Sequence, residues 1–249
     1  MRLPDNYTHR LIDCLTRSRL SFALYRLPWT DECYIILQAS EEVNTLDDIT
    51  ELNGKQGFVI APFQQTKEHP IVLIHPDVTA YDWPEISQAV ASLKYADAIL
   101  SCKPLATVPV TTMNEEERYS RYFAAFNRFM EPLKNKSIKK LVLSRPAFCS
   151  IDENFSPLET FVKACNAYPR MMIYLCHTPV SGTWLGSTPE ILLSGQAMNW
   201  STVALAGTMP IENGVEPTEW SDKNKEEQAI VAEYVRKIVK KHGRKTFEK

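Results

Sequence analysis

The stretch Trp184–Thr208, WLGSTPEILLSGQAMNWSTVALAGT, decides how we interpret the rest of the chain. Pro189 fixes φ and has no backbone N–H, so it predicts an abrupt start of a strand with Glu190 at its head. Gly207 lets another group approach the backbone closely. A carboxylate and a bare backbone on neighbouring strands predict one wall of a small site for an anionic substrate, and a hairpin with a surface glutamate is the alternative. The two apolar runs that predict these strands are Ile191–Leu193 and Val203–Thr208.

Outward from this stretch, the chain predicts further strands and helices. Four apolar runs have connections too short for helical crossovers and therefore predict antiparallel pairing: Ser21–Arg26, Cys33–Gln38, Gly57–Pro62 and Pro70–His75. A further strand is expected at Arg170–Cys176. Helices are expected at 8–18, near 84–94, and at Thr112–Lys134, Ser156–Ala167 and Pro217–His242.

The two longest helices carry apolar stripes that predict their buried faces. In 112–134, with Asn114 or Thr112 as the cap, we interpret the stripe as core rather than as a ligand cage: Tyr119, Tyr122, Phe123, Phe126 and Met130. In 217–242 the stripe is Ile230, Val231, Tyr234, Ile238 and Val239. Glu227 is in phase with this second stripe, whereas Glu226 is not. A carboxylate on a buried face needs a lysine, a metal ion or a proton, and Lys223 is the local candidate.

Lys139–Arg145, KKLVLSR, predicts another strand, in which Lys140 shares a face with Val142 and Ser144. A lysine there is either a solvated strand end or a partly buried amine that acts as a base.

Composition excludes several functional classes. The 249 residues are 44% hydrophobic and 23% charged with a net charge of −2, so nothing favours nucleic acid or an anionic membrane as a partner. The six cysteines form no C-x-x-C pair, and the histidines form no zinc motif. No apolar run approaches the roughly 20 residues of a membrane helix. We therefore expect a cytoplasmic protein with reduced thiols, and a monomer.

Four motifs occur in the order and with the gaps of a known family: KLVLSR at 140–145, GSTPE at 186–190, ALAGT at 204–208 and KNKEEQAIV at 223–231. With them the chain resembles the chorismate-utilising enzymes, which include isochorismate, salicylate, anthranilate and aminodeoxychorismate synthases. The resemblance implies an α+β fold of mainly antiparallel sheets packed together with helices outside. It implies one chorismate-binding domain over 1–249, with a variable sheet-forming half at 1–110 and a motif-bearing part at 111–249.

The resemblance also implies a role for each motif residue. Lys140 stands where the water-using members have a lysine base, and Glu190 matches the general acid. Glu227 matches a carboxylate that holds Mg²⁺, a hard cation that prefers such ligands. The residues that line the substrate pocket are Ala206, Gly207 and Thr208.

The implied activity, closest to isochorismate synthase, interconverts chorismate and isochorismate. Lys140 deprotonates a water that attacks C2 of the ring, and protonated Glu190 donates to the departing C4 hydroxyl. This requires a lysine that is neutral near pH 7, although a free lysine has a pKa of about 10.4, and a glutamic acid protonated well above about 4.3. Ala206 stands where aminodeoxychorismate synthases carry a nucleophilic lysine, which argues against covalent amination. The product would serve menaquinone or siderophore biosynthesis.

Some positions depart from the family pattern. Gln228 stands where many relatives have histidine, Asn224 where many have an acidic residue, and Met209-Pro210 where arginine is frequent. The family continues past the last helix with a second magnesium-binding glutamate and an arginine, so we expect this chain to be the truncated amino-terminal two-thirds, with little turnover of its own. The alternatives are a salicylate synthase, which adds pyruvate elimination, an anthranilate synthase-like enzyme, or a non-catalytic remnant.

Overall fold

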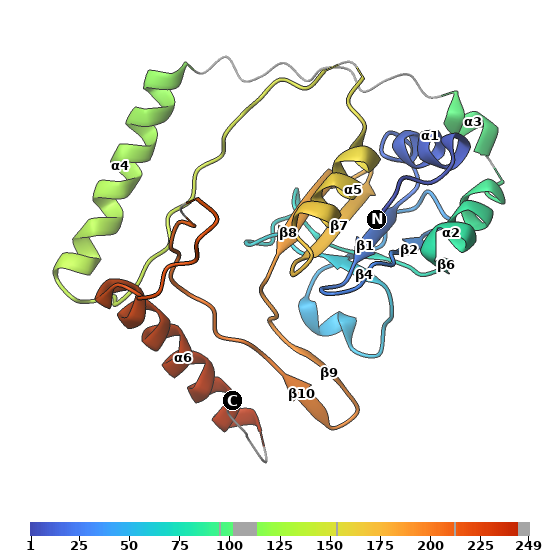
Figure 1. Ribbon diagram of the computed structural model, residues 1–249. Coiled ribbons are helices and arrows are strands. Elements are labelled where there is room, and N and C mark those ends of the chain that lie inside the picture. Colours follow the sequence, from blue (N-terminus) through green and yellow to red (C-terminus); the bar gives the residue numbers. More distant parts are fainter. Residues whose placement is uncertain (95, 102–113, 153, 212, 244–249) are drawn as a thin grey trace. The chain divides into compact units, whose positions relative to one another are not determined.

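The computed structural model describes residues 1–94, 96–101, 114–152, 154–211 and 213–243, in two compact units (Figure 1). The first unit comprises Met1–Val108 and Ser150–Pro189, and the second comprises Pro109–Cys149 and Glu190–Lys249. Over the described ranges, no helix is long and apolar enough to cross a membrane.

The first unit is built on a five-stranded antiparallel sheet of order β6-β2-β1-β7-β8. Residues 22, 24, 35, 37, 173 and 175 point to one face, and residues 23, 36, 174 and 176 point to the other, as a period of two requires. Its strands are β1 (Phe22–Arg26), β2 (Tyr34–Leu37), β6 (Val78–Tyr81), β7 (Met172–Thr178) and β8 (Gly182–Thr188). The predicted strands at 21–26, 33–38 and 170–176 are therefore confirmed.

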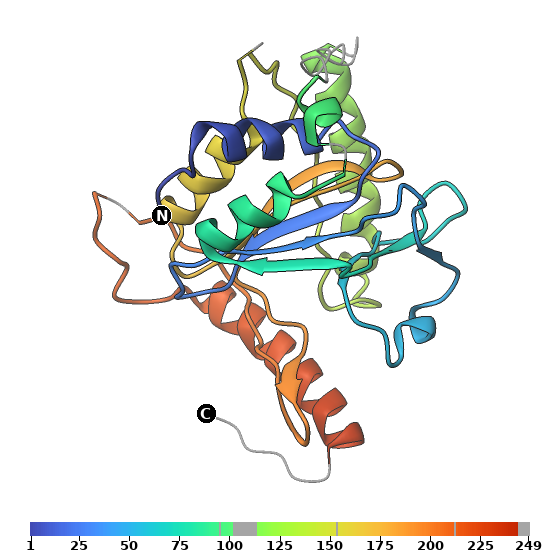
Figure 2. The same ribbon diagram turned by 90° about the vertical axis from the view of Figure 1, so that its right-hand side faces the viewer.

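Helices cover the first of these faces and enclose the main core (Figure 2). Leu11 and Ile12 from α1 and Leu158 and Phe161 from α5 are fully buried against the sheet. The helices of this unit are α1 (Asn6–Leu15), α2 (Asp82–Ala91), α3 (Ala96–Leu100) and α5 (Pro157–Ala167).

A smaller antiparallel sheet of order β3-β5-β4 packs on the opposite face. Ala23, Ile74 and Cys176 form a buried cluster that joins the two sheets. The smaller sheet contains β3 (Thr45–Leu46), β4 (Phe58–Ile60) and β5 (Ile71–Ile74), and the 3₁₀ helix η1 (Ile49–Leu52) follows β3. The runs at 57–62 and 70–75 do pair antiparallel, and the α+β class with packed antiparallel sheets is confirmed.

The second unit contains α4 (Glu115–Lys134), the hairpin of β9 (Ser194–Gln196) and β10 (Asn199–Ser201), and α6 (Asp222–His242). Asn114 caps α4 by accepting the N–H of Glu117 at 2.7 Å, as expected, and the alternative cap Thr112 lies outside the described residues. Ser221 caps α6 in the same way through the N–H of Asn224, at 3.3 Å.

Three of the strand predictions are wrong. No strand forms at 139–145, at Ile191–Leu193 or at Val203–Thr208. The single backbone bond between the last two segments runs from the Val203 N–H to the Ile191 carbonyl, at 3.4 Å. An apolar run becomes a strand only when a partner continues the ladder, and in the described part of this unit the pairing does not continue.

The prediction that the stripes of the two long helices are buried is also wrong. No residue of α4 or α6 is buried, and Tyr119 and Tyr234 are 63% and 67% exposed. On α4 the rings stack on one another instead, with 6.1 Å between the centroids of Tyr119 and Phe123. Periodicity identified residues that share a face, but it carries no information on what covers that face.

Candidate active site

The second unit brings Lys140 and Glu227 together in an ion pair. The Nζ of Lys140 lies 2.9 Å from Oε1 of Glu227, and the two side chains are 23% and 32% exposed. Hydrogen bonding and the charge of Lys140 hold the pKa of Glu227 below its ordinary value, with smaller contributions from the Gly207 N–H and the charge of Lys223. The carboxylate predicted to need a partner therefore has one, and it is the distant Lys140 rather than an ion pair with the local Lys223.

The helical phase of Glu227 explains this encounter. Its side chain is partly buried, whereas its neighbour Glu226 is exposed, as the stripe of α6 predicted. Lys140 lies in the extended segment that follows α4, where no strand is formed. The pairing therefore joins two motifs that are far apart along the chain.

The segment Ala204–Thr208 lies against the same face of α6. The Gly207 backbone lies beside the Glu227 carboxylate and contributes to its lowered pKa. Asn224 Nδ2 donates to the carbonyl of Thr208 at 3.3 Å, and Gln228 Nε2 donates to the carbonyl of Ala204 at 2.6 Å. Residues three and four apart on a helix share a face, so these three side chains can contact one backbone segment.

Gly207 is required at its position. Its φ is +81°, in the left-handed region. A Cβ built there would lie 3.2 Å from Cβ of Asn224 and 3.3 Å from its carbonyl oxygen. Backbone conformation and the close approach of α6 therefore both favour glycine.

Glu190 is exposed and opens the segment that follows β8. The carbonyl of its neighbour Ile191 accepts from the Val203 N–H and, at 3.2 Å, from Oγ1 of Thr202. Glu190 therefore belongs to a segment that runs beside the residues leading into Ala204–Thr208. The expected position at the head of a strand is wrong, because β9 begins only at Ser194.

The donor set at Glu227 does not fit a magnesium ion as it stands. In the described part of the chain, no three His, Cys, Asp or Glu side chains gather in a group that could hold a metal. One carboxylate oxygen of Glu227 is bound by an ammonium group, which a cation would have to displace.

Two contributors to this cluster, Asn224 and Gln228, were noted in the sequence only as departures from a family pattern. Their spacing from Glu227, at −3 and +1, was the available signal, because residues at i, i+3 and i+4 lie on one helical face. What the sequence could not provide was the partner, since both amides bind backbone carbonyls and backbone groups have no sequence signature.

A comparison of the sequence with known families identifies the family to which this chain belongs. A family model described as chorismate binding enzyme matches residues 45–247, so the chain belongs to this family of chorismate-utilising enzymes. The match begins well before residue 140, where the first of the four motifs begins. Chorismate is thus the small-molecule substrate that the family assigns. No curated protein matches the chain.

Proposed function

We propose that this chorismate-utilising enzyme acts as an isochorismate synthase. The observation that carries the proposal is the ion pair of Lys140 with Glu227 beside Gly207, because it joins residues from three separate motifs in one cluster. Ala206 argues against covalent amination by the enzyme, since a methyl side chain cannot attack the ring as a lysine would.

In the proposed reaction, the oxygen of a water molecule forms a bond to C2 of chorismate while Lys140 takes a proton from that water. Glu190 gives a proton to the C4 hydroxyl, which leaves as water, so the net change is an isomerisation. To act as the base, Lys140 must be a neutral amine when it takes this proton. Glu227 would then hold the amine in place through the cycle, and the backbone of Ala206–Thr208 would line the pocket.

Magnesium enters the proposal through the family resemblance, with Glu227 as its ligand. Because Lys140 occupies Oε1 of Glu227, the ion and the ammonium would compete for this oxygen. Direct measurement of metal binding therefore tests the cofactor separately from the reaction.

The test of the function is product analysis after incubation of the chain with chorismate, with and without Mg²⁺. A small amount of isochorismate, absent with the Glu190→Gln variant, is the expected product. Salicylate with pyruvate would favour the salicylate synthase alternative, and anthranilate formed with ammonia the anthranilate synthase alternative. Chorismate binding measured by calorimetry without any product would favour the non-catalytic remnant, and the absence of both binding and product would overturn the proposal.

A further inference from the structure

The backbone carbonyls at the two ends of Ala204–Thr208 accept hydrogen bonds from side-chain amides of α6. The carbonyl of Ala204 meets an amide donor of Gln228, and the carbonyl of Thr208 meets an amide donor of Asn224. Between them Gly207 lies beside Glu227 and contributes to its lowered pKa. The two amide bonds therefore hold the segment at both ends against α6.

We propose that Gln228 and Asn224 are positioning residues, which hold Ala204–Thr208 so that Gly207 lies beside the ion pair of Lys140 and Glu227. They act through the backbone. An effect of these two residues on chorismate binding rests on the proposed function, but their role in holding Ala204–Thr208 does not.

The hydrogen bonding of the Gln228 side-chain amide supports this role. Only its Nε2 can donate to the Ala204 carbonyl, and this choice leaves Oε1 buried without a partner among the described residues. An unpaired buried acceptor costs stability, so packing alone gives no reason for an amide here. The bond from Nε2 to the segment does give one.

The hydrogen bonds from the amides to the segment also predict which substitutions should loosen it. Gln228→Glu keeps the shape but places a carboxylate oxygen against the Ala204 carbonyl, which repels the segment. Gln228→His retains a ring N–H that can donate to the same carbonyl. Ala229→Glu adds the same charge at the next position, which is exposed, and is the matched control.

The experiment measures amide hydrogen exchange at Gly207 in the whole chain without ligand, with circular dichroism to verify the helices. We expect Gln228→Glu to speed exchange by at least about tenfold, the loss of one hydrogen bond, while Gln228→His and Ala229→Glu stay near the wild type. Unchanged exchange in Gln228→Glu, or an equal increase in Ala229→Glu, would overturn the proposal. If Gln228→Glu does not fold, Asn224→Asp provides the same donor-to-acceptor change at the other end of the segment.

Calorimetry with chorismate separates the two proposals. If the positioning serves the substrate site, Gln228→Glu binds chorismate more weakly and Gln228→His restores the affinity at unchanged thermal stability. Equal affinity in all three proteins would overturn the positioning role toward substrate. Failure of the wild type to bind chorismate would contradict the proposed function, while the exchange result would still decide whether the amides hold Gly207.

Discussion

Lys140 Nζ and Glu227 Oε1 lie 2.9 Å apart, so the residues that the motifs mark as base and metal ligand neutralise one another. The pair is partly exposed, and such pairs contribute little to folding. Its importance lies in orientation, because the pair lies beside the Gly207 backbone, which also contributes to the lowered pKa of Glu227. Each residue therefore limits what the other can do.

Replacement of Lys140 by alanine tests its role as the base. If Lys140 acts in the transition state, Lys140→Ala should lower kcat for isochorismate formation by at least about 100-fold with little change in KM. Lys139→Ala, which removes the exposed neighbour, is the control. Initial rates against chorismate concentration provide both constants, and a near-normal kcat in Lys140→Ala would leave Lys140 as a structural partner of Glu227.

A second prediction concerns competition between Lys140 and a metal ion. Removing the ammonium frees the oxygen of Glu227 and abolishes its repulsion of a cation, so Lys140→Met should bind Mg²⁺ a few-fold more tightly than the wild type. Lys139→Met should leave the affinity unchanged. Calorimetry measures both without turnover, and weaker binding in Lys140→Met would show that Glu227 is not a ligand.

The sequence predicted helices and strands well where they depend on local signals such as apolar alternation and capping residues. Strands β1 and β7 alternate apolar residues between two faces, and α4 begins after its predicted capping residue Asn114. The last helix begins at Asp222 rather than at the predicted Pro217. The segments 139–145 and 203–208 have equally apolar sequences, but strand formation depends on a partner elsewhere in the chain. Their apolar patterns therefore predicted strands that do not form.

In the candidate site, too, local signals in the sequence were informative, whereas contacts with distant segments could not be predicted. The periodicity of α6 correctly distinguished Glu227, which is partly buried, from the exposed Glu226, although no residue of the predicted stripe is fully buried. It also made Lys223 the natural partner, because only neighbours on the helix can be found from spacing. The structure brings Lys140 there from another motif, and that contact could not be derived from helical phase.

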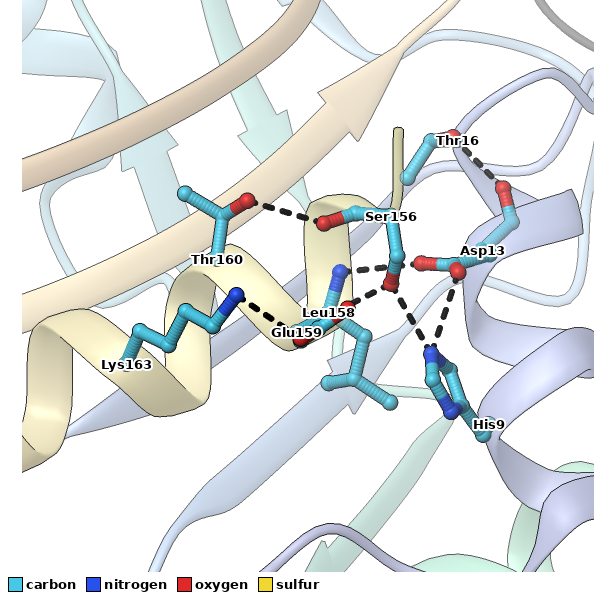
Figure 3. A network of polar contacts seen from close by, with 8 residues as sticks. All are labelled: His9, Asp13, Thr16, Ser156, Leu158, Glu159, Thr160 and Lys163. Carbon is cyan, nitrogen blue, oxygen red and sulfur yellow. Dashed lines mark hydrogen bonds and ion pairs between the residues drawn. The ribbon is translucent and has the colours of Figure 1, made fainter. Parts of the chain in front are cut away.

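The contact between α1 and α5 yields a prediction about stability (Figure 3). Ser156 caps α5 by accepting the Glu159 N–H at 2.9 Å, and His9 Nε2 lies 2.8 Å from the same oxygen. Asp13 accepts the Leu158 N–H at 2.9 Å and lies 3.3 Å from His9. Ser156→Ala should lower the free energy of unfolding by about 1 kcal/mol, whereas Ser156→Asn, also a good cap, should lose less. Urea denaturation measures both, and equal losses would show that the cap does not stabilise the helix.

His177 predicts how stability depends on pH. Its Nε2 lies 3.0 Å from the Ser18 carbonyl and therefore carries the proton, while Nδ1 faces Oγ1 of Thr183 at 2.8 Å. Burial lowers the pKa of His177 below the ordinary histidine value. The unfolded chain then takes up a proton before the folded one, so stability falls as the pH drops below about 6.5.

Denaturation at several pH values in this range tests the prediction with two variants. His177→Gln removes the titrating group and should flatten the dependence, while His69→Gln, at an exposed position, should not. An identical pH dependence in the wild type and His177→Gln would mean that another group is responsible.

Gly186, the first residue of the GSTPE motif, has a packing role that leads to the last prediction. It lies directly opposite Tyr174 in the β7–β8 pairing, and the tyrosine ring crosses the glycine. A Cβ at Gly186 would lie 2.2 Å from Cζ of Tyr174, a distance that forces the ring to move. The ring is also in contact with Phe58, with 6.2 Å between centroids, so its displacement disturbs the packing of the two sheets. Gly186→Ala should therefore reduce the free energy of unfolding by about 1–3 kcal/mol.

The double variant Gly186→Ala with Tyr174→Leu distinguishes this cause from an effect on the strand itself. Leucine is shorter than tyrosine and leaves room for the added methyl group, so the penalty of Gly186→Ala should largely disappear in that background, and the two substitutions should be non-additive. Ser187→Ala, on the exposed next residue of β8, is the control and should change stability little. If the penalty persists unchanged in the Tyr174→Leu background, the ring is not its cause, and the glycine of this motif must be required for the backbone or for the neighbouring Glu190 instead.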